Sequence, residues 1–352
     1  MMEFREIVLD HCKRYPKLSV RDLFKLLYQY SFGCEHLVSD EKTVLARIIA
    51  EAESIKNGTP EAVEPLGDYC RVGLSYLGQG LSAETLARIF CLSAKHDKNG
   101  ERKLHEGINI ITELADSGLI PINRDEWSAA LYEWKSAEFP AVRHSDEYRE
   151  IYSPTYRVIA KKYADILPLL ARIDSMLKVG EVRLAIEGGS ASGKSTLGKM
   201  LAEIYGCTLF HMDDFFLTPN MRTAERLAEA GGNVDRERFL AEVLTPLSRG
   251  EEIAYRRYDC SMGEIMPPES KKPTRLTVTE GAYSLHPDLA DLYNLKVFID
   301  VTPELQRARI LKRNSPEMAE RHFSTWIPME ERYFDAFGIR EIGDMTLIAE
   351  EI

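Results

Sequence analysis

Eight consecutive residues, 188–195, have the types and spacing that bind a polyphosphate. They read Gly-Gly-Ser-Ala-Ser-Gly-Lys-Ser and satisfy the pattern GxxxxGK(S/T). Glycines let the backbone curl so that successive N–H groups point toward phosphate oxygens. Lys194 would reach the β- and γ-phosphates, and the Ser195 hydroxyl would join phosphate, water and carboxylate oxygens around Mg²⁺. The pattern predicts ATP binding, with Mg²⁺, by Gly188, Gly189, Ser190, Ala191, Ser192, Gly193, Lys194, Ser195 and Thr196.

Carboxylates occur at two further points in the same half of the chain. Transfer of a phosphoryl group to an alcohol needs one carboxylate to deprotonate the hydroxyl and another to hold Mg²⁺. Asp213 and Asp214 follow a β-rich run, and because adjacent strand side chains point opposite ways, only one should face the γ-phosphate. Glu280, just before Gly281, is either a second metal-linked acid or an ordinary acid at a strand end.

The elements that must position these residues alternate between strand and helix from residue 179 onward. Strands are predicted at 182–186, 207–212, 275–279, 295–301 and 345–349, and helices at 194–205, 236–248 and 303–314. Such alternation indicates an α/β fold, with a parallel sheet covered by helices on both faces. Ligands of open α/β sheets bind at the carboxyl edge of the strands, where the loop and the acids would meet.

Residues 1–178 have a different character and are predicted to form an all-α domain of unknown role. Apolar residues recur at helical spacing over 19–30, 82–94, 104–117 and 125–137, and 156–177 is predicted as a last long helix. A loop is expected at 57–60. Cys34-Glu35-His36 lacks a second ligand pair at metal-site spacing and is interpreted as structural. The dense stretch 138–145 suggests a binding surface.

The ordered motifs of residues 179–352 resemble those of the uridine kinase/phosphoribulokinase family. They are the P-loop, Met212-Asp213-Asp214-Phe215-Phe216, Asn233-Val234-Asp235, Tyr258-Asp259 and Glu280-Gly281. The resemblance implies a P-loop NTPase fold. It also implies the following roles: Asp213 as catalytic base, Lys194 and Ser195 as phosphate and Mg²⁺ residues, Glu280 and Asp213 as metal-linked acids, Asp235 and Tyr258 as acceptor-binding residues, and Arg309 and Arg313 as a clamp on the transferring phosphate.

One departure from that family concerns the acceptor. Uridine kinases carry a His or aromatic residue after their Tyr-Asp pair that reads the pyrimidine, whereas Cys260-Ser261-Met262-Gly263-Glu264 follows here. Pyrimidine recognition is therefore not indicated. Arg256 and Arg257, just before, either meet an anionic substrate or are exposed loop arginines.

Composition narrows the function classes further. The chain has 352 residues, with 45 Lys+Arg, 56 Asp+Glu and a net charge of -11, which disfavours binding of nucleic acid by bulk electrostatics. No apolar run has the roughly 18 residues of a membrane-spanning helix, and residues 1–17 contain no signal-peptide core. Six separated cysteines without a CxxC pair favour a reducing cytoplasm. The motifs of GTPases (NKxD) and of transporter ATPases (LSGGQ) are absent.

Together these observations predict an ATP-dependent kinase acting on a hydroxyl of a nucleoside-like or sugar-like small molecule. Residues 314–326 would form a mobile lid that excludes water. The chain is expected to be cytoplasmic, without a membrane or nucleic-acid partner, and a homo-oligomer is possible. The alternatives are an ATP-binding regulatory module that phosphorylates no acceptor and a kinase of nucleic-acid ends.

Overall fold

The computed structural model describes residues 3–38, 40–53, 63–94 and 98–351, so the loop predicted at 57–60 lies outside the described residues. The chain divides into two compact units, Met1–Ala171 and Arg172–Ile352. The division falls inside helix α9 (Leu167–Leu177), seven residues before the boundary expected after residue 178. Every helix in the described part of the chain is too short or too polar to cross a membrane.

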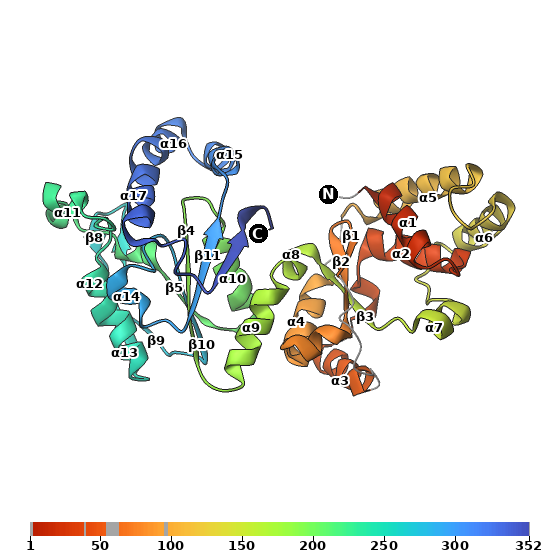
Figure 1. Ribbon diagram of the computed structural model, residues 1–352, viewed down its shortest axis with the longest axis horizontal. Coiled ribbons are helices and arrows are strands. Elements are labelled where there is room, and N and C mark those ends of the chain that lie inside the picture. The colour runs from red at the N-terminus through yellow and green to blue at the C-terminus, as the bar shows by residue number, and fades with distance from the viewer. Residues whose placement is uncertain (1–2, 39, 54–62, 95–97, 352) are drawn as a thin grey trace. The chain divides into compact units, whose positions relative to one another are not determined.

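The N-terminal unit is mainly helical, as predicted (Figure 1). Its apolar stripes form the core: Leu23 and Leu27 of one helix, Ile111 of another and Trp127 of a third are each fully buried. The helices are α1 (Phe4–Arg14), α2 (Val20–Phe32), α3 (Glu41–Glu53), α4 (Ala83–Ser93), α5 (Gly100–Asp116), α6 (Arg124–Ser136), α7 (Asp146–Tyr152) and α8 (Lys161–Ala164).

This unit is not purely α-helical, however, because it contains an antiparallel three-stranded sheet, β1 (Glu64–Leu66), β2 (Tyr69–Gly73) and β3 (Tyr156–Ala160). The long helix expected over 156–177 was therefore wrong at its start. Val158 and Ile159 are β-branched, and they are buried where β3 pairs with β2. Helical structure begins only at Lys161. Pro168 is the second residue of α9, in the first turn of the helix, where a backbone N–H would have no partner within the helix, so proline is tolerated there.

The C-terminal unit contains the predicted parallel sheet, with five strands in the order β12-β11-β4-β10-β5. Their bounds are β4 (Val182–Gly188), β5 (Thr208–His211), β10 (Leu276–Glu280), β11 (Leu295–Asp300) and β12 (Met345–Ile348). In register, Glu280 at the end of β10 lies beside Ile186 of β4 and His211 of β5. The carboxyl ends of these three strands therefore meet at one edge, which confirms the α/β fold with a parallel sheet.

Helices cover both faces of this sheet (Figure 1). Helix α10 (Lys194–Tyr205) packs on β4, β5 and β10. The other face holds a core with Phe210, Phe239, Phe298 and Tyr333 among its members. That core is built by α14 (Pro287–Ala290), α17 (Ile327–Phe337) and the helix predicted at 236–248, which comprises α12 (Arg236–Phe239), a π-helical turn at Leu240–Leu244 and α13 (Thr245–Ser248).

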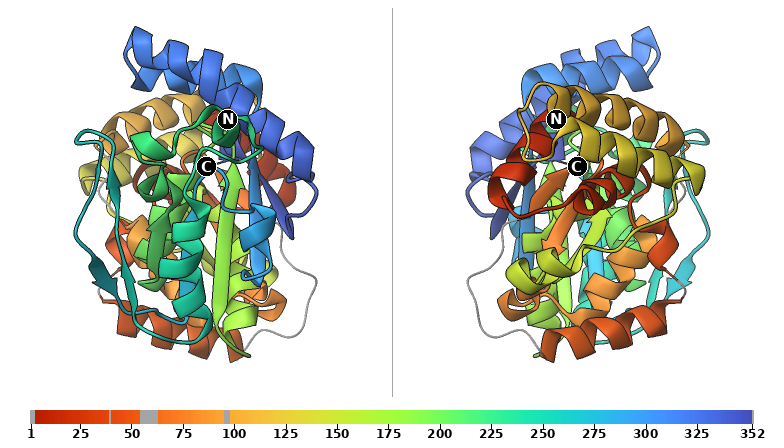
Figure 2. Two further views of the ribbon diagram at one scale, coloured as in Figure 1. Left: turned by 90° about the vertical axis from the view of Figure 1, so that its left-hand side faces the viewer. Right: turned by 90° about the vertical axis from the view of Figure 1, so that its right-hand side faces the viewer.

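Three further groups of elements complete this unit. Helices α15 (Pro303–Arg313), α16 (Pro316–Arg321) and α17 lie at one end of the unit, in blue in Figure 2. Two antiparallel pairs follow α13: β6 (Ile253–Tyr255) with β9 (Glu269–Lys271), and β7 (Tyr258–Asp259) with β8 (Glu264–Ile265). A 3₁₀ turn, η3 (Met212–Phe215), follows β5, and helix α11 (Ala224–Ala228) lies further along the chain.

Candidate active site

The predicted phosphate-binding loop connects β4 to α10 and has a tightly curled backbone. Gly188 has φ +149°, and a Cβ there would lie 2.5 Å from the carbonyl oxygen of Ile299, so only glycine fits. Gly193, with φ +114°, immediately precedes α10. The Lys194 ammonium donates to the carbonyl oxygens of Gly188 at 2.8 Å and Gly189 at 2.7 Å. The lysine therefore lies over the loop, where its charge can meet a phosphate chain.

A cavity of about 1170 Å³ opens in front of this loop. It is lined by the loop residues 190–196 and, among the other predicted site residues, by Asp213, Tyr258, Glu280, Arg309 and Arg313. Six lining residues are basic and three are acidic, although the whole chain has a net charge of -11. This volume exceeds that of a typical single-ligand pocket, about 300–1,000 Å³. It has room for a nucleotide and a small second substrate.

Glu280 lies beside the start of α10 and is buried. The Ser195 hydroxyl donates to Glu280 Oε2 at 3.1 Å, and His211 Nδ1 contacts the other carboxylate oxygen. That second contact is the main reason that the pKa of His211 is raised. A hydroxyl and a carboxylate oxygen side by side are hard donors of the kind that Mg²⁺ prefers.

Within the described residues, no group of three or more His, Cys, Asp or Glu side chains is placed to hold a metal ion. A P-loop site does not need such a group, because phosphate oxygens and water complete the Mg²⁺ shell. The residues present therefore fit Mg²⁺ that arrives together with a nucleotide.

Asp213 and Asp214 lie in the turn η3, because the strand predicted at 207–212 ends at His211. Asp213 lines the cavity, whereas Asp214 is not a lining residue. Surrounding protein removes water from the Asp213 carboxyl and raises its pKa, while Lys194 acts in the opposite direction. Of the two neighbours, the structure brings Asp213 to the cavity.

The two arginines of α15 that were expected to clamp the phosphate, Arg309 and Arg313, have different surroundings. Arg309 donates from Nη1 to the carbonyl oxygens of Ala191 at 3.2 Å and Ser192 at 3.1 Å, and from Nη2 to Ala349 at 2.8 Å. These bonds fix the backbone of the loop. Arg313, one turn further along, is exposed at the cavity.

Asp235, expected to bind the acceptor, does not lie at the cavity. Its carboxylate caps α12 by accepting from the backbone N–H of Arg238 at 3.1 Å and pairs with the buried Arg238 guanidinium at 2.9 Å. These contacts stabilise the helix start and neutralise a buried cation. Asn233, two residues earlier, lines the cavity instead.

Two acidic residues that the sequence did not single out have close contacts with the loop. Glu330 of α17 is buried and accepts from the Ser190 N–H at 2.8 Å and the Ser190 hydroxyl at 2.7 Å. Glu187, fully buried at the end of β4, accepts from the N–H of Gly188 at 2.9 Å. Burial raises the pKa of Glu330. It also raises the pKa of Glu187, to about 7. No local motif marks Glu330, since 140 residues separate it from Ser190.

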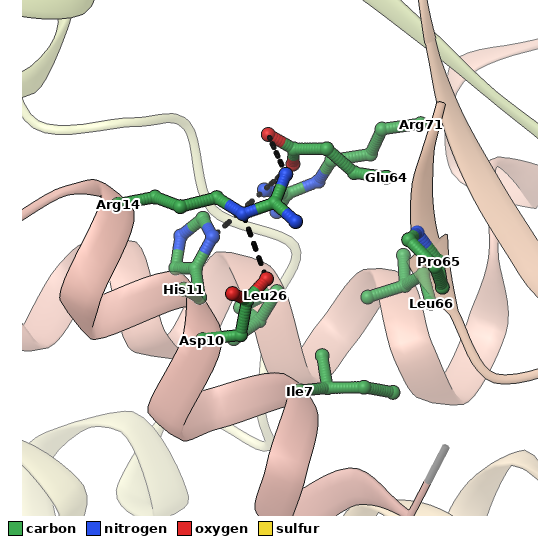
Figure 3. Close-up of a pocket in the computed structure, with 9 residues that line it drawn as sticks. All are labelled: Ile7, Asp10, His11, Arg14, Leu26, Glu64, Pro65, Leu66 and Arg71. Atoms are coloured by element: carbon green, nitrogen blue, oxygen red, sulfur yellow. Dashed lines mark hydrogen bonds and ion pairs between the residues drawn. The ribbon is translucent and has the colours of Figure 1, made fainter. Parts of the chain in front are cut away.

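The cavity of the N-terminal unit shown in Figure 3 is much smaller, about 10 Å³. It lies beside a buried polar cluster, in which the Arg71 guanidinium bonds to Gln29 Oε1 at 2.7 Å and contacts His11 Nδ1 at 3.4 Å. A hollow of this size holds at most one water molecule. His144, from the stretch 138–145, is buried against Asp22 at 2.9 Å and so has a structural position.

Comparison with known proteins agrees with the motifs of the C-terminal unit. Residues 184–326 match the model of the Phosphoribulokinase / Uridine kinase family. A "Uridine kinase-like protein 3" of Arabidopsis thaliana is 26% identical over 144 residues, which cover 38% of this chain and 31% of that protein. A "Phosphoribulokinase" of Synechocystis is 26% identical over 145 residues, or 40% of this chain and 43% of that protein. The chain therefore spans less than half the length of these curated relatives.

One similar solved structure is a putative fructose transport system kinase from Silicibacter, with 22% identity and a TM-score of 0.44. The similarity covers 53% of this chain and 98% of the Silicibacter chain. The family resemblance that the motifs predicted for the C-terminal half is confirmed by the family match. The matched region contains the loop, Asp213, Tyr258, Glu280, Arg309 and Arg313.

Proposed function

We propose that this protein is an ATP-dependent kinase that transfers the γ-phosphate to a hydroxyl of a small nucleoside-like or sugar-like molecule. The observation that carries the proposal is the convergence of Lys194, Ser195, Glu280 and Asp213 on one cavity. The family match at residues 184–326 and the similarity to two kinases support it. An ATP-binding loop without a partner carboxylate would support nucleotide binding alone.

In the proposed reaction, the acceptor hydroxyl attacks the γ-phosphorus in line with the bond to ADP. A new P–O bond forms, the bond to the β-phosphate oxygen breaks, and the hydroxyl proton moves to the Asp213 carboxylate. Lys194 exchanges its two loop carbonyls for phosphate oxygens and stabilises the charge that spreads over them. Mg²⁺, held by Ser195 and Glu280, would supply further positive charge beside the phosphates.

Arg309 and Arg313, which line the same cavity, complete the proposed phosphate site. Arg309 fixes the loop backbone, and Arg313 is free to reach the transferring group. The proposed lid, residues 314–326, carries Met318, Arg321 and Trp326, all of which line the cavity. Closing it over the nucleotide would keep water from the γ-phosphate and limit hydrolysis.

The test is a panel of nucleosides, sugars and other small alcohols, with ADP release as the readout and Lys194→Ala as the blank. The proposal predicts ADP release that depends on one acceptor class and disappears in the variant. ATP binding without acceptor-dependent ADP release would indicate the regulatory module instead. Release only with oligonucleotide ends would indicate a nucleic-acid kinase.

We also propose that the protein works in the cytoplasm. All six cysteines are free thiols. Burial raises the pKa of Cys12 and Cys34 to about 12, which keeps these thiols protonated and unreactive. Free, unreactive thiols suit a reducing compartment.

A further inference from the structure

The acceptor side of the cavity holds a cation that the proposed chemistry does not use. Arg222, between η3 and α11, lines the cavity together with Tyr258 and Asp213. Its Nε donates to the carbonyl oxygen of Leu217 at 3.0 Å, and its Nη2 donates to the Tyr258 hydroxyl at 3.4 Å. The guanidinium carbon lies 5.8 Å from the centre of the Tyr258 ring. These contacts hold the guanidinium at the cavity wall.

No carboxylate forms an ion pair with Arg222 in the part of the chain that the structure describes. The guanidinium donates instead to a backbone carbonyl and to a neutral hydroxyl. The two arginines that the sequence suggested for an anionic substrate behave differently. Arg256 pairs with Glu242, Arg257 pairs with Glu269 at 2.7 Å, and neither lines the cavity. Those two are therefore satisfied within the protein, while Arg222 keeps donors for a ligand.

The position of Arg222 separates it from the cations that face the phosphates. Lys194 and Arg309 bond to the loop itself. Arg222 instead contacts Tyr258 of β7, and β7 packs against the turn η3 that carries Asp213. An alcohol whose hydroxyl reaches Asp213 would therefore have Arg222 beside the rest of its skeleton.

We propose that the acceptor is an alcohol that also carries an anionic group, a carboxylate or a phosphate ester, bound by Arg222. This inference rests on the proposed kinase function and specifies its substrate class. Guanidinium binds carboxylate and phosphate through parallel N–H···O bonds, and in a cavity such charge-assisted bonds are stronger than bonds to a neutral hydroxyl. Neutral nucleosides would leave this cation unpaired.

The experiment measures binding separately from transfer. The full chain is loaded with Mg²⁺ and the non-hydrolysable analogue AMP-PNP, and small alcohols are titrated into it by calorimetry. The panel contains hydroxy acids and sugar phosphates of three to six carbons, each paired with the neutral alcohol of the same skeleton, for example glycerate and glycerol 3-phosphate with glycerol. Comparing the acids with the phosphates tells which of the two anionic groups is bound.

The variants are Arg222→Gln, Arg222→Lys and, as a matched control, Arg257→Gln, which removes an equal charge outside the cavity. We expect an anionic member to bind at least about 10-fold more tightly than its neutral partner, in line with a charge-assisted pair. Arg222→Gln should abolish that preference, Arg257→Gln should keep it, and AMP-PNP affinity should change in neither. If Arg222→Gln fails to fold, the same titrations are made with Arg222→Lys, which keeps the charge.

Three results would overturn the inference: equal binding of neutral and anionic members, binding of no anionic member, or a loss of AMP-PNP affinity in Arg222→Gln in place of acceptor affinity. Turnover of the same panel with ATP then tests the kinase proposal by itself. Selective anion binding that depends on Arg222, without ADP release, would count against the kinase function and leave the acceptor-site inference standing.

Discussion

Asp213 and Asp214 show how surroundings separate two identical side chains. Asp213 lines the cavity near Lys194 and Glu280, and limited hydration raises its pKa. Asp214 is not a lining residue, although burial raises its pKa as well, while His211, Arg257 and Lys271 act in the opposite direction. A carboxylate with a raised pKa accepts a proton more readily than an ordinary one.

Replacing Asp213 by Asn should therefore remove the base while leaving the nucleotide site in place. We expect Asp213→Asn to lower acceptor-dependent ADP release by roughly 10²–10⁴-fold, the usual contribution of general base catalysis. AMP-PNP affinity, measured by calorimetry, should stay within about threefold. Asp214→Asn is the matched control and should stay within a few-fold of the unmodified protein. Full activity in Asp213→Asn would transfer the role to Asp214.

At the scale of the elements, the junction of β10 and η3 holds Asp213 near Glu280. Gly281 has φ +140°, and a Cβ there would lie 2.6 Å from the Cβ of Met212. Gly281→Ala should push the turn away and destabilise the unit by roughly 2–3 kcal/mol, through backbone strain and overpacking. It should also lower turnover, because Asp213 is the next residue after Met212.

Gly206→Ala is the control for that change. Gly206 also has a positive φ, +62°, but a Cβ there meets nothing within 4 Å. We expect Gly206→Ala to lower the free energy of unfolding by about 1 kcal/mol and to leave turnover unchanged. Thermal denaturation measures the first effect and the ADP assay the second. Equal effects of the two substitutions on turnover would show that the junction does not position Asp213.

The folding stability should depend on pH through Glu187, at the end of β4. Its pKa is raised to about 7 by burial, above an ordinary value of 4.5, so the folded state keeps a proton that the unfolded state has lost. The stabilisation is complete below about pH 4.5 and is lost as the pH rises to 7, by up to roughly 3 kcal/mol. Glu187→Gln stays neutral and should show a smaller fall in melting temperature between pH 5 and 7.5. An unchanged fall would contradict this assignment.

The sequence predicted the elements whose patterns are local and missed the contacts that depend on folding. The loop 188–195 and the five parallel strands follow from glycine spacing and apolar runs, and both are observed. The strand β3 was missed because its pairing with β2 brings together segments more than 80 residues apart. Asp235 was assigned to the acceptor from the family resemblance, whereas in the structure its carboxylate pairs with Arg238, three residues further along the chain. Glu330 and Arg222 reach the cavity only through the fold.

At the scale of the whole molecule, two units with separate cores should unfold separately. Each unit buries its own apolar residues, and the proposed nucleotide site lies wholly in the second. Calorimetry should show two unfolding transitions. AMP-PNP with Mg²⁺ at 100 times its Kd should raise the midpoint temperature of only one of them. The expected rise is about 5–10 °C, from roughly 2.7 kcal/mol of binding free energy and 2–4 °C per kcal/mol for a unit of this size. A single transition that moves as a whole would show that the units are coupled.

The measurement that tests the central claim most directly is ³¹P NMR of ATP, Mg²⁺ and the acceptor panel with the full chain. The account predicts a new phosphate resonance of the acceptor that grows in step with ADP and is lost in Asp213→Asn. ADP accompanied only by inorganic phosphate, at a rate that no acceptor changes, would contradict it.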